Sequence, residues 1–254
     1  MKRIAITALL TAAAAAGQAS ATTYVYDRDN PPQNSAAGFM ENITTTWTPS
    51  NNRLTWSVTF SDQLTNGFYL ALSPGENPKS NSGQLGFLYF DATDTSDVAV
   101  TAYAYRGQGL NSYLEGDVSQ AGNQAPDFIA STEGTADGSW VIDASVTDAG
   151  GKRTLSLTLD ATVIQNHVPL YPDPDGEPWT GVSFGERLGY WFGSFRGLQT
   201  NYTADGMLTE WGFSARGWSD TANLHTITVV PLPPAAWAGL IGLAGATVLR
   251  RRMG

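Results

Sequence analysis

One stretch of the chain matches the pattern of a catalytic serine. Residues 181–185 read Gly-Val-Ser-Phe-Gly, the spacing of a nucleophile elbow around Ser183, and Asp220 and His225 follow in the order of a Ser-Asp-His triad. An elbow needs a buried strand before the serine and a helix after it. Here a Pro/Asp-rich loop precedes the motif, and an aromatic run typical of a strand follows it. We therefore interpret the match as chance and expect no catalysis.

Two loops rich in carboxylates are candidates for binding calcium. Asp91, Asp94 and Asp97 lie in a predicted loop after a strand, and residues 173–177 place three more acidic side chains in a second loop. Hard oxygen ligands of this kind suit Ca²⁺, although neither loop has the EF-hand spacing. Solvated acidic loops are the alternative that we favour. Calcium at Asp91, Asp94 and Asp97 stays a candidate site, and we expect no other cofactor.

Two tryptophans are candidates for contact with a ligand. Aromatic rings stack on sugar rings, and Trp179 and Trp218 both lie in predicted loops. Trp56 and Trp140 instead alternate in phase with aliphatic residues, which predicts burial in a core. The sequence thus leaves a carbohydrate-binding module, with or without calcium, as the alternative to a protein that binds no small ligand.

The elements that must position these residues are β-strands. Apolar and polar residues alternate with a period of two, which predicts one buried face and one wet face, with a core containing Leu54, Trp56, Val58, Phe60, Leu70, Leu155 and Leu157. Further strands are predicted over 85–90, 140–146, 190–195, 208–213 and 224–230, and one short helix over 160–165. Short strands without a fixed repeat favour a single all-β sandwich, jelly-roll or lectin-like, over residues 22–229.

The composition limits the class of protein further. The chain has 14 Lys and Arg against 23 Asp and Glu, a formal net charge of −9, which argues against a nucleic-acid-binding surface. It has no cysteine, which excludes disulfides, thiol nucleophiles and Cys-ligated metals. Only 15% of residues are charged and 11% are aromatic, a balance that suits turn-rich β-structure.

The beginning of the chain has the pattern of a secretory signal peptide. Residues 1–21 start with Lys2 and Arg3, continue with an apolar stretch and end in the small-residue sequence Ala-Ser-Ala. We predict that signal peptidase removes this segment and that the rest of the chain is exported.

The other end combines three features within residues 230–254. In order these are a proline motif, an apolar run and a basic cluster, namely Val230, Pro231, Leu232 and Pro233, then residues 235–249, then Arg250, Arg251 and Arg252. As a helix the run is about 22 Å long, marginal for a hydrocarbon core of roughly 30 Å. The positive-inside rule places the arginines in the cytoplasm and the body of the protein outside.

This C-terminal arrangement resembles the PEP-CTERM class of bacterial sorting signals, in the variant with Val-Pro-Leu-Pro. The resemblance covers residues 230–254 and nothing else. It implies cleavage near the proline motif by a membrane enzyme of the exosortase type, and delivery to the cell surface or to an extracellular polysaccharide matrix. A permanent membrane anchor is the alternative. We therefore expect an exported structural protein that the tail holds in the membrane before processing.

Overall fold

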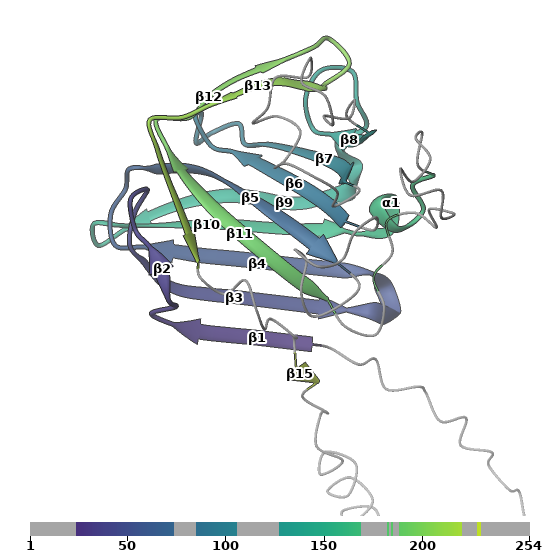
Figure 1. Cartoon of the computed structure of the whole chain (residues 1–254). Helices are drawn as coiled ribbons and strands as arrows, with labels where there is room; N and C mark the ends of the chain where they lie inside the picture. Colours follow the sequence, from purple (N-terminus) through teal and green to yellow (C-terminus); the bar gives the residue numbers. More distant parts are fainter. Residues whose placement is uncertain are drawn as a thin grey trace, which may run out of the picture.

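Two β-sheets stacked face to face make up most of the described chain (Figure 1). The computed structural model describes residues 24–73, 85–105, 127–168, 182, 184, 188–219 and 228–229. Within these ranges, one short α-helix and two 3₁₀ turns accompany the strands. The predominantly β character predicted from the sequence is confirmed.

Each sheet is antiparallel and brings together strands from distant parts of the chain. Sheet A has the order β15 (Thr228–Val229), β1 (Tyr24–Asp29), β3 (Met40–Thr48), β4 (Arg53–Phe60), β10 (Lys152–Asp160) and β9 (Val141–Ala149). Sheet B has the order β2 (Gln33–Asn34), β14 (Ala215–Ser219), β11 (Gly189–Arg196), β5 (Thr65–Ser73), β6 (Leu85–Asp91), β7 (Ala99–Tyr105) and β8 (Asp127–Ser131). A separate hairpin contains β12 (Gln199–Tyr202) and β13 (Leu208–Gly212), and α1 (Thr162–Gln165) follows β10.

The main core lies between the two sheets, as the alternating pattern predicts. All seven residues expected in the core are fully buried, which confirms that prediction. Trp56 of β4 lies at the centre, with its ring centroid 4.8 Å from that of Tyr190 and 5.2 Å from that of Phe192, both on β11 of the opposite sheet. These rings bury large apolar areas in edge-on and tilted arrangements, and they therefore contribute strongly to holding the sheets together.

The outer face of sheet A presents rows of hydroxyl groups. Three cross-strand pairs join β4 to β10 through their side-chain oxygens, at 3.2 Å, 3.1 Å and 3.0 Å, namely Thr55 with Thr158, Ser57 with Ser156, and Thr59 with Thr154. These positions are the polar half of the same alternation that places leucines and tryptophan in the core. The face is thus polar, and each of these hydroxyl groups has a neighbour as a hydrogen-bond partner.

The outer face of sheet B is aromatic, and the β12–β13 hairpin covers part of it (Figure 1). Trp211 of the hairpin lies with its ring centroid 4.9 Å from Tyr89 and 5.2 Å from Phe195. The Tyr103 hydroxyl accepts a hydrogen bond from the Leu208 amide at 2.8 Å and donates one to the Leu208 carbonyl at 3.1 Å. Sheet B therefore has a buried apolar layer on both faces.

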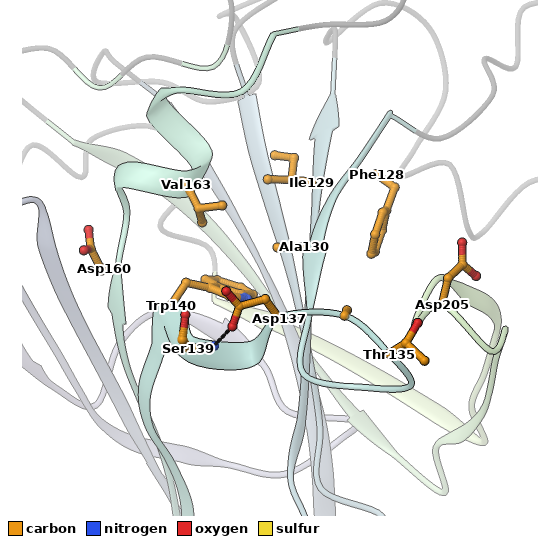
Figure 2. A pocket seen from close by; sticks show the side chains of 11 residues that line it. Phe128, Ile129, Ala130, Thr135, Asp137, Ser139, Trp140, Asp160, Val163 and Asp205 are labelled. Carbon is orange, nitrogen blue, oxygen red and sulfur yellow. Dashed lines mark hydrogen bonds between the residues drawn. The ribbon is translucent and has the colours of Figure 1, made fainter.

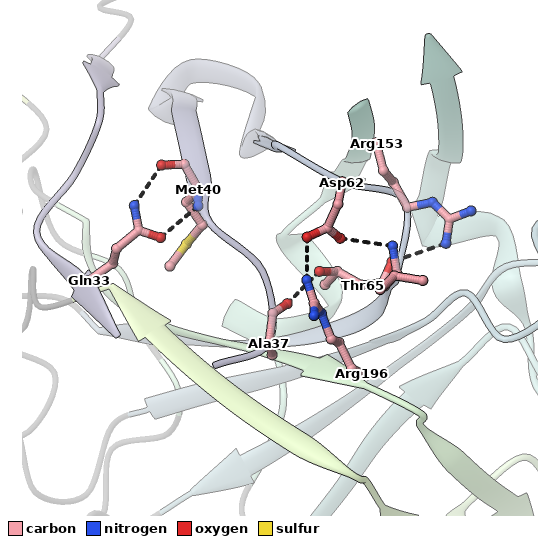
Figure 3. Close-up of polar contacts among 8 residues, drawn as sticks. Gln33, Ala37, Met40, Asp62, Thr65, Arg153 and Arg196 are labelled. Atoms are coloured by element: carbon pink, nitrogen blue, oxygen red, sulfur yellow. Dashed lines mark hydrogen bonds and ion pairs between the residues drawn. The ribbon is translucent and has the colours of Figure 1, made fainter. Parts of the chain in front are cut away.

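Two arginines link the sheets at one end of the sandwich (Figure 3). Arg153 of β10 donates to the Thr65 carbonyl at 3.1 Å and binds both carboxylate oxygens of Asp148 at 2.8 Å and 2.7 Å. Arg196 of β11 forms an ion pair with Asp62 in the turn between β4 and β5. These contacts tie β10 and the β4–β5 turn to sheet B.

The predicted elements agree with the structure except near their ends. The strands expected over 85–90, 190–195 and 208–213 correspond to β6, β11 and β13, and the expected helix corresponds to α1. The strand expected to begin at Trp140 begins one residue later, at Val141, because Trp140 is the last residue of a 3₁₀ turn. The Asp137 side chain caps this turn by accepting a hydrogen bond from the Ser139 amide. Of the strand expected over 224–230, the described part is β15.

The two chain ends of the described body lie side by side. β15 pairs with β1 at the edge of sheet A, with Val229 opposite Tyr24. No helix in the described ranges has the length and apolarity needed to cross a membrane. The signal peptide predicted over 1–21 and the sorting segment predicted over 230–254 lie outside the described residues.

Candidate ligand-binding sites

Trp218 lies in a strand and not in the loop that the sequence suggested. It belongs to β14, where it pairs with Gly193 of β11, and Gly193 in turn pairs with Tyr69 of β5. Residues that pair directly across an antiparallel sheet share a face, so Trp218 lies on the outer, aromatic face of sheet B. Its side chain is 39% exposed, which leaves part of the indole ring open to solvent.

Three other side chains that contact one another lie on this face. Arg216 lies two residues earlier on the same strand, with its guanidinium carbon 5.1 Å from the ring centroid of Tyr69 and 5.9 Å from that of Trp191. Arg216 also donates a hydrogen bond to the Tyr69 hydroxyl. We call Tyr69, Trp191, Arg216 and Trp218 the Trp218 patch. It combines an exposed aromatic ring with a positioned cation, which suits stacking on a polyhydroxylated ring.

Asp91, the first of the candidate calcium ligands, is buried beneath the β12–β13 hairpin. Its side chain is 4% exposed, and both carboxylate oxygens accept hydrogen bonds. Oδ1 accepts from the amide and hydroxyl of Thr93 at 2.9 Å and 2.7 Å. Oδ2 accepts from the hydroxyls of Thr200 at 2.5 Å and Tyr202 at 3.1 Å. Burial is the main cause that raises the pKa of Tyr202 far above its usual value, and the negative charge of Asp91 is the second.

The other two candidate calcium ligands are not gathered around Asp91. Asp94 is exposed, and its Oδ1 accepts from the hydroxyl and amide of Ser96 at 2.6 Å and 2.8 Å, which lowers its pKa. Burial raises the pKa of nearby Glu133, as do the charges of Asp97 and Asp91. In the part of the chain that the structure describes, no three Asp, Glu or His side chains form a group able to hold a metal ion. Calcium binding stays a prediction.

An open pocket of about 520 Å³ lies between β8, α1 and the loop over 132–140 (Figure 2). Its apolar lining includes Phe128 and Ile129 of β8, Val163 of α1 and Trp140. Figure 2 shows Val163 above Trp140, and Phe128 to the right of both. Trp140 is 6% exposed because most of its ring packs into the main core.

The polar lining of this pocket is acidic. It contains Asp137, Asp160 at the end of β10 and Asp205 in the β12–β13 turn (Figure 2). Hydrogen bonds from Ser139 lower the pKa of Asp137, and hydrogen bonds from Thr162 lower the pKa of Asp160. Both carboxylates are therefore ionised at neutral pH, and among the described residues no Lys, Arg or His lines the pocket.

Two glycines fix the pocket loop against the hairpin turn. Gly134 has φ +63°, and a Cβ there would come within 2.4 Å of the Ala204 carbonyl oxygen. Gly206 has φ +87°, and its Cβ would lie 2.3 Å from the Glu133 carbonyl oxygen. The Thr135 amide donates to the Ala204 oxygen at 3.0 Å. Sequence reasoning missed this pocket, because its walls come from β8, β10, α1 and the hairpin turn, and only the fold brings these together.

The remaining predicted site residues lie outside the described part of the chain. These are Trp179, Ser183, Asp220, His225 and the sorting residues Val230, Pro231, Leu232, Pro233, Arg250, Arg251 and Arg252. Next to Ser183, the side chains of Val182 and Phe184 are both buried in the main core.

Comparisons with known proteins give no relative for this chain. No family model, no curated protein and no solved structure matches it.

Proposed function

We propose that the protein is an exported bacterial surface or extracellular-matrix protein, processed through its C-terminal sorting signal and without catalytic activity. The observation that carries this proposal is the order of the proline motif, the apolar run over 235–249 and the three arginines at 250–252. The signal-peptide pattern over 1–21 supports it independently, because a tail of this type functions only in an exported chain.

We further propose that residues 22–229 form one sandwich of the jelly-roll or lectin-like kind. The shared core between sheets A and B supports this finer description. The pairing of Tyr24 with Val229 supports a body that is complete between the two targeting segments, since both junctions then lie at one edge of sheet A.

The processing proposal is tested by mass spectrometry of the mature protein from its native host. We expect an N-terminus at Thr22 and a C-terminus near Pro231 to Pro234. Recovery of the intact tail through Gly254 would replace processing with permanent anchoring. Replacing Arg250, Arg251 and Arg252 with glutamine should reduce membrane retention of the precursor, because it removes the positive-inside signal. Unchanged retention would contradict that role.

Carbohydrate binding is the second candidate function, and the Trp218 patch favours it. An indole that is 39% exposed lies on the same face as an arginine that contacts two aromatic rings. Apolar rings beside a few positioned polar groups are typical of small-ligand sites. Trp179 stays a further candidate for this function.

A glycan array and polysaccharide pull-down, each with and without Ca²⁺, test this second function. Binding that is lost in Trp218→Ala and kept in Ile142→Ala would support it, because Ile142 is a 47% exposed residue on β9 of the other sheet. Binding to no glycan would leave the structural role, and binding that both variants keep would place the glycan site outside the Trp218 patch. Calcium dependence would favour a ligand role for Asp91, Asp94 and Asp97.

A further inference from the structure

We propose that the pocket between β8, α1 and the 132–140 loop binds a hexosamine unit with a free ammonium group, carried by an aminopolysaccharide. The pocket is separate from the Trp218 patch and shares no residue with it. The choice of a polysaccharide as the source of the ammonium group rests on the proposed export to a surface or matrix.

The size and apolar lining suit a sugar ring. A volume of about 520 Å³ lies within the range of small-ligand pockets. Phe128 and Val163, with the small exposed part of Trp140, provide apolar surface on which the C–H face of a sugar can pack (Figure 2). The butyl chain of a lysine is thin and would leave much of this volume unfilled, so the shape favours a sugar over a basic peptide.

The charges of the lining select a cationic group. Asp137, Asp160 and Asp205 line the pocket, and no basic residue among the described ones lines it. Arg53 pairs with Asp160 across β4 and β10 and partly neutralises its charge. Asp137 is therefore the better ammonium partner. Uronic acids and phosphorylated sugars would be repelled.

Calorimetry with the full chain in detergent tests the proposal, using hexamers of β-1,4-linked glucosamine. We expect binding that weakens with added salt and is at least about tenfold weaker for the N-acetylated hexamer, which has no cation. Asp137→Asn should lose at least about tenfold in affinity. The matched control Asp143→Asn, at an exposed carboxylate on β9, should bind as the native protein does.

Phe128→Ala provides a second variant at a half-buried position, and circular dichroism checks that it folds. Equal binding of the N-acetylated hexamer, or full binding by Asp137→Asn, would overturn the proposal. Preference for oligolysine would assign the pocket to a basic peptide instead, and no binding of any probe would refute it. If glucosamine binding holds while mass spectrometry finds an unprocessed, unexported chain, the site stands and the matrix assignment fails.

Discussion

Replacing Asp91 with asparagine should loosen the β12–β13 hairpin from sheet B. The Asp91 carboxylate joins β6 to the hairpin through Thr200 and Tyr202, and it holds the start of its own loop through Thr93. An asparagine keeps the size of the side chain, but it turns one acceptor oxygen into an NH₂ donor that faces hydroxyl groups. The perturbation therefore acts on hydrogen bonds and charge, with little change in packing.

The size of the effect follows from the contacts. A hydrogen bond to a charged group contributes about 1.5–3 kcal/mol, and two such bonds reach Oδ2. Removing the charge also relieves repulsion of Glu133, whose pKa is raised by burial and by Asp97 and Asp91. We therefore expect Asp91→Asn to lower the free energy of unfolding by about 2–4 kcal/mol. Tyr202→Phe removes one of the two bonds and should cost about 1–2 kcal/mol.

Urea denaturation followed by tryptophan fluorescence measures the stability of both variants, and Trp211 on the hairpin is one of the eight tryptophans that contribute to the signal. A change below about 0.5 kcal/mol for Asp91→Asn would refute the anchoring role. The same titration with calcium tests the metal prediction, because a ligand that binds only the folded state raises its stability. Stabilisation of the native protein but not of Asp91→Asn would identify Asp91 as a calcium ligand.

Three further changes test the core, a glycine and an ion pair. Trp56→Phe should lower the free energy of unfolding by about 2 kcal/mol in urea, as the ring is fully buried, and a change below about 0.5 kcal/mol would count against its central place. Gly134→Ala should cost more in thermal melting than Gly150→Ala, because both have positive φ but nothing lies within 4 Å of a Cβ at Gly150, and equal costs would contradict the close approach. Hydrogen bonding to Arg153 lowers the pKa of Asp148, so this pair stabilises the fold above the ordinary carboxyl value of 3.8 and loses that contribution as pH falls below it. In Asp148→Asn the urea midpoint should change less with pH, between about pH 5 and pH 2, than it does in the native protein. The same pH dependence in both proteins would contradict this role.

The main core could be predicted from the sequence because its signal is local. Leu54, Trp56 and Val58 alternate with polar residues within one strand, and β10 repeats the pattern with Leu155 and Leu157. A period of two fixes which face each side chain occupies before any partner strand is known. The all-β character needs no long-range information for the same reason.

The sites could not be predicted in this way, because they depend on pairing between distant strands. Gly217 before Trp218 suggested a loop, and only the pairing with β11 places Trp218 in a strand. One hydrogen-bond partner of Asp91 is Tyr202, 111 residues away. The sequence did contain one indication of the covered outer face of sheet B. Tyr69 and Ala71 lie between the core residues of β5, so that both faces of this strand are apolar, which is typical of a strand buried on both faces.

The hydroxyl rows give the outer face of sheet A a polarity that does not come from charge. Proteins commonly resist association through like charges, which dissolved salt screens over about 10 Å at 0.1 M. The three Thr and Ser pairs between β4 and β10 carry no charge and no proton that titrates near neutral pH. In each pair one hydroxyl donates to the other, so one of the two protons stays available for water. The hydration of this face does not depend on charge, so it should persist at salt concentrations that would mask the negative charge of the chain.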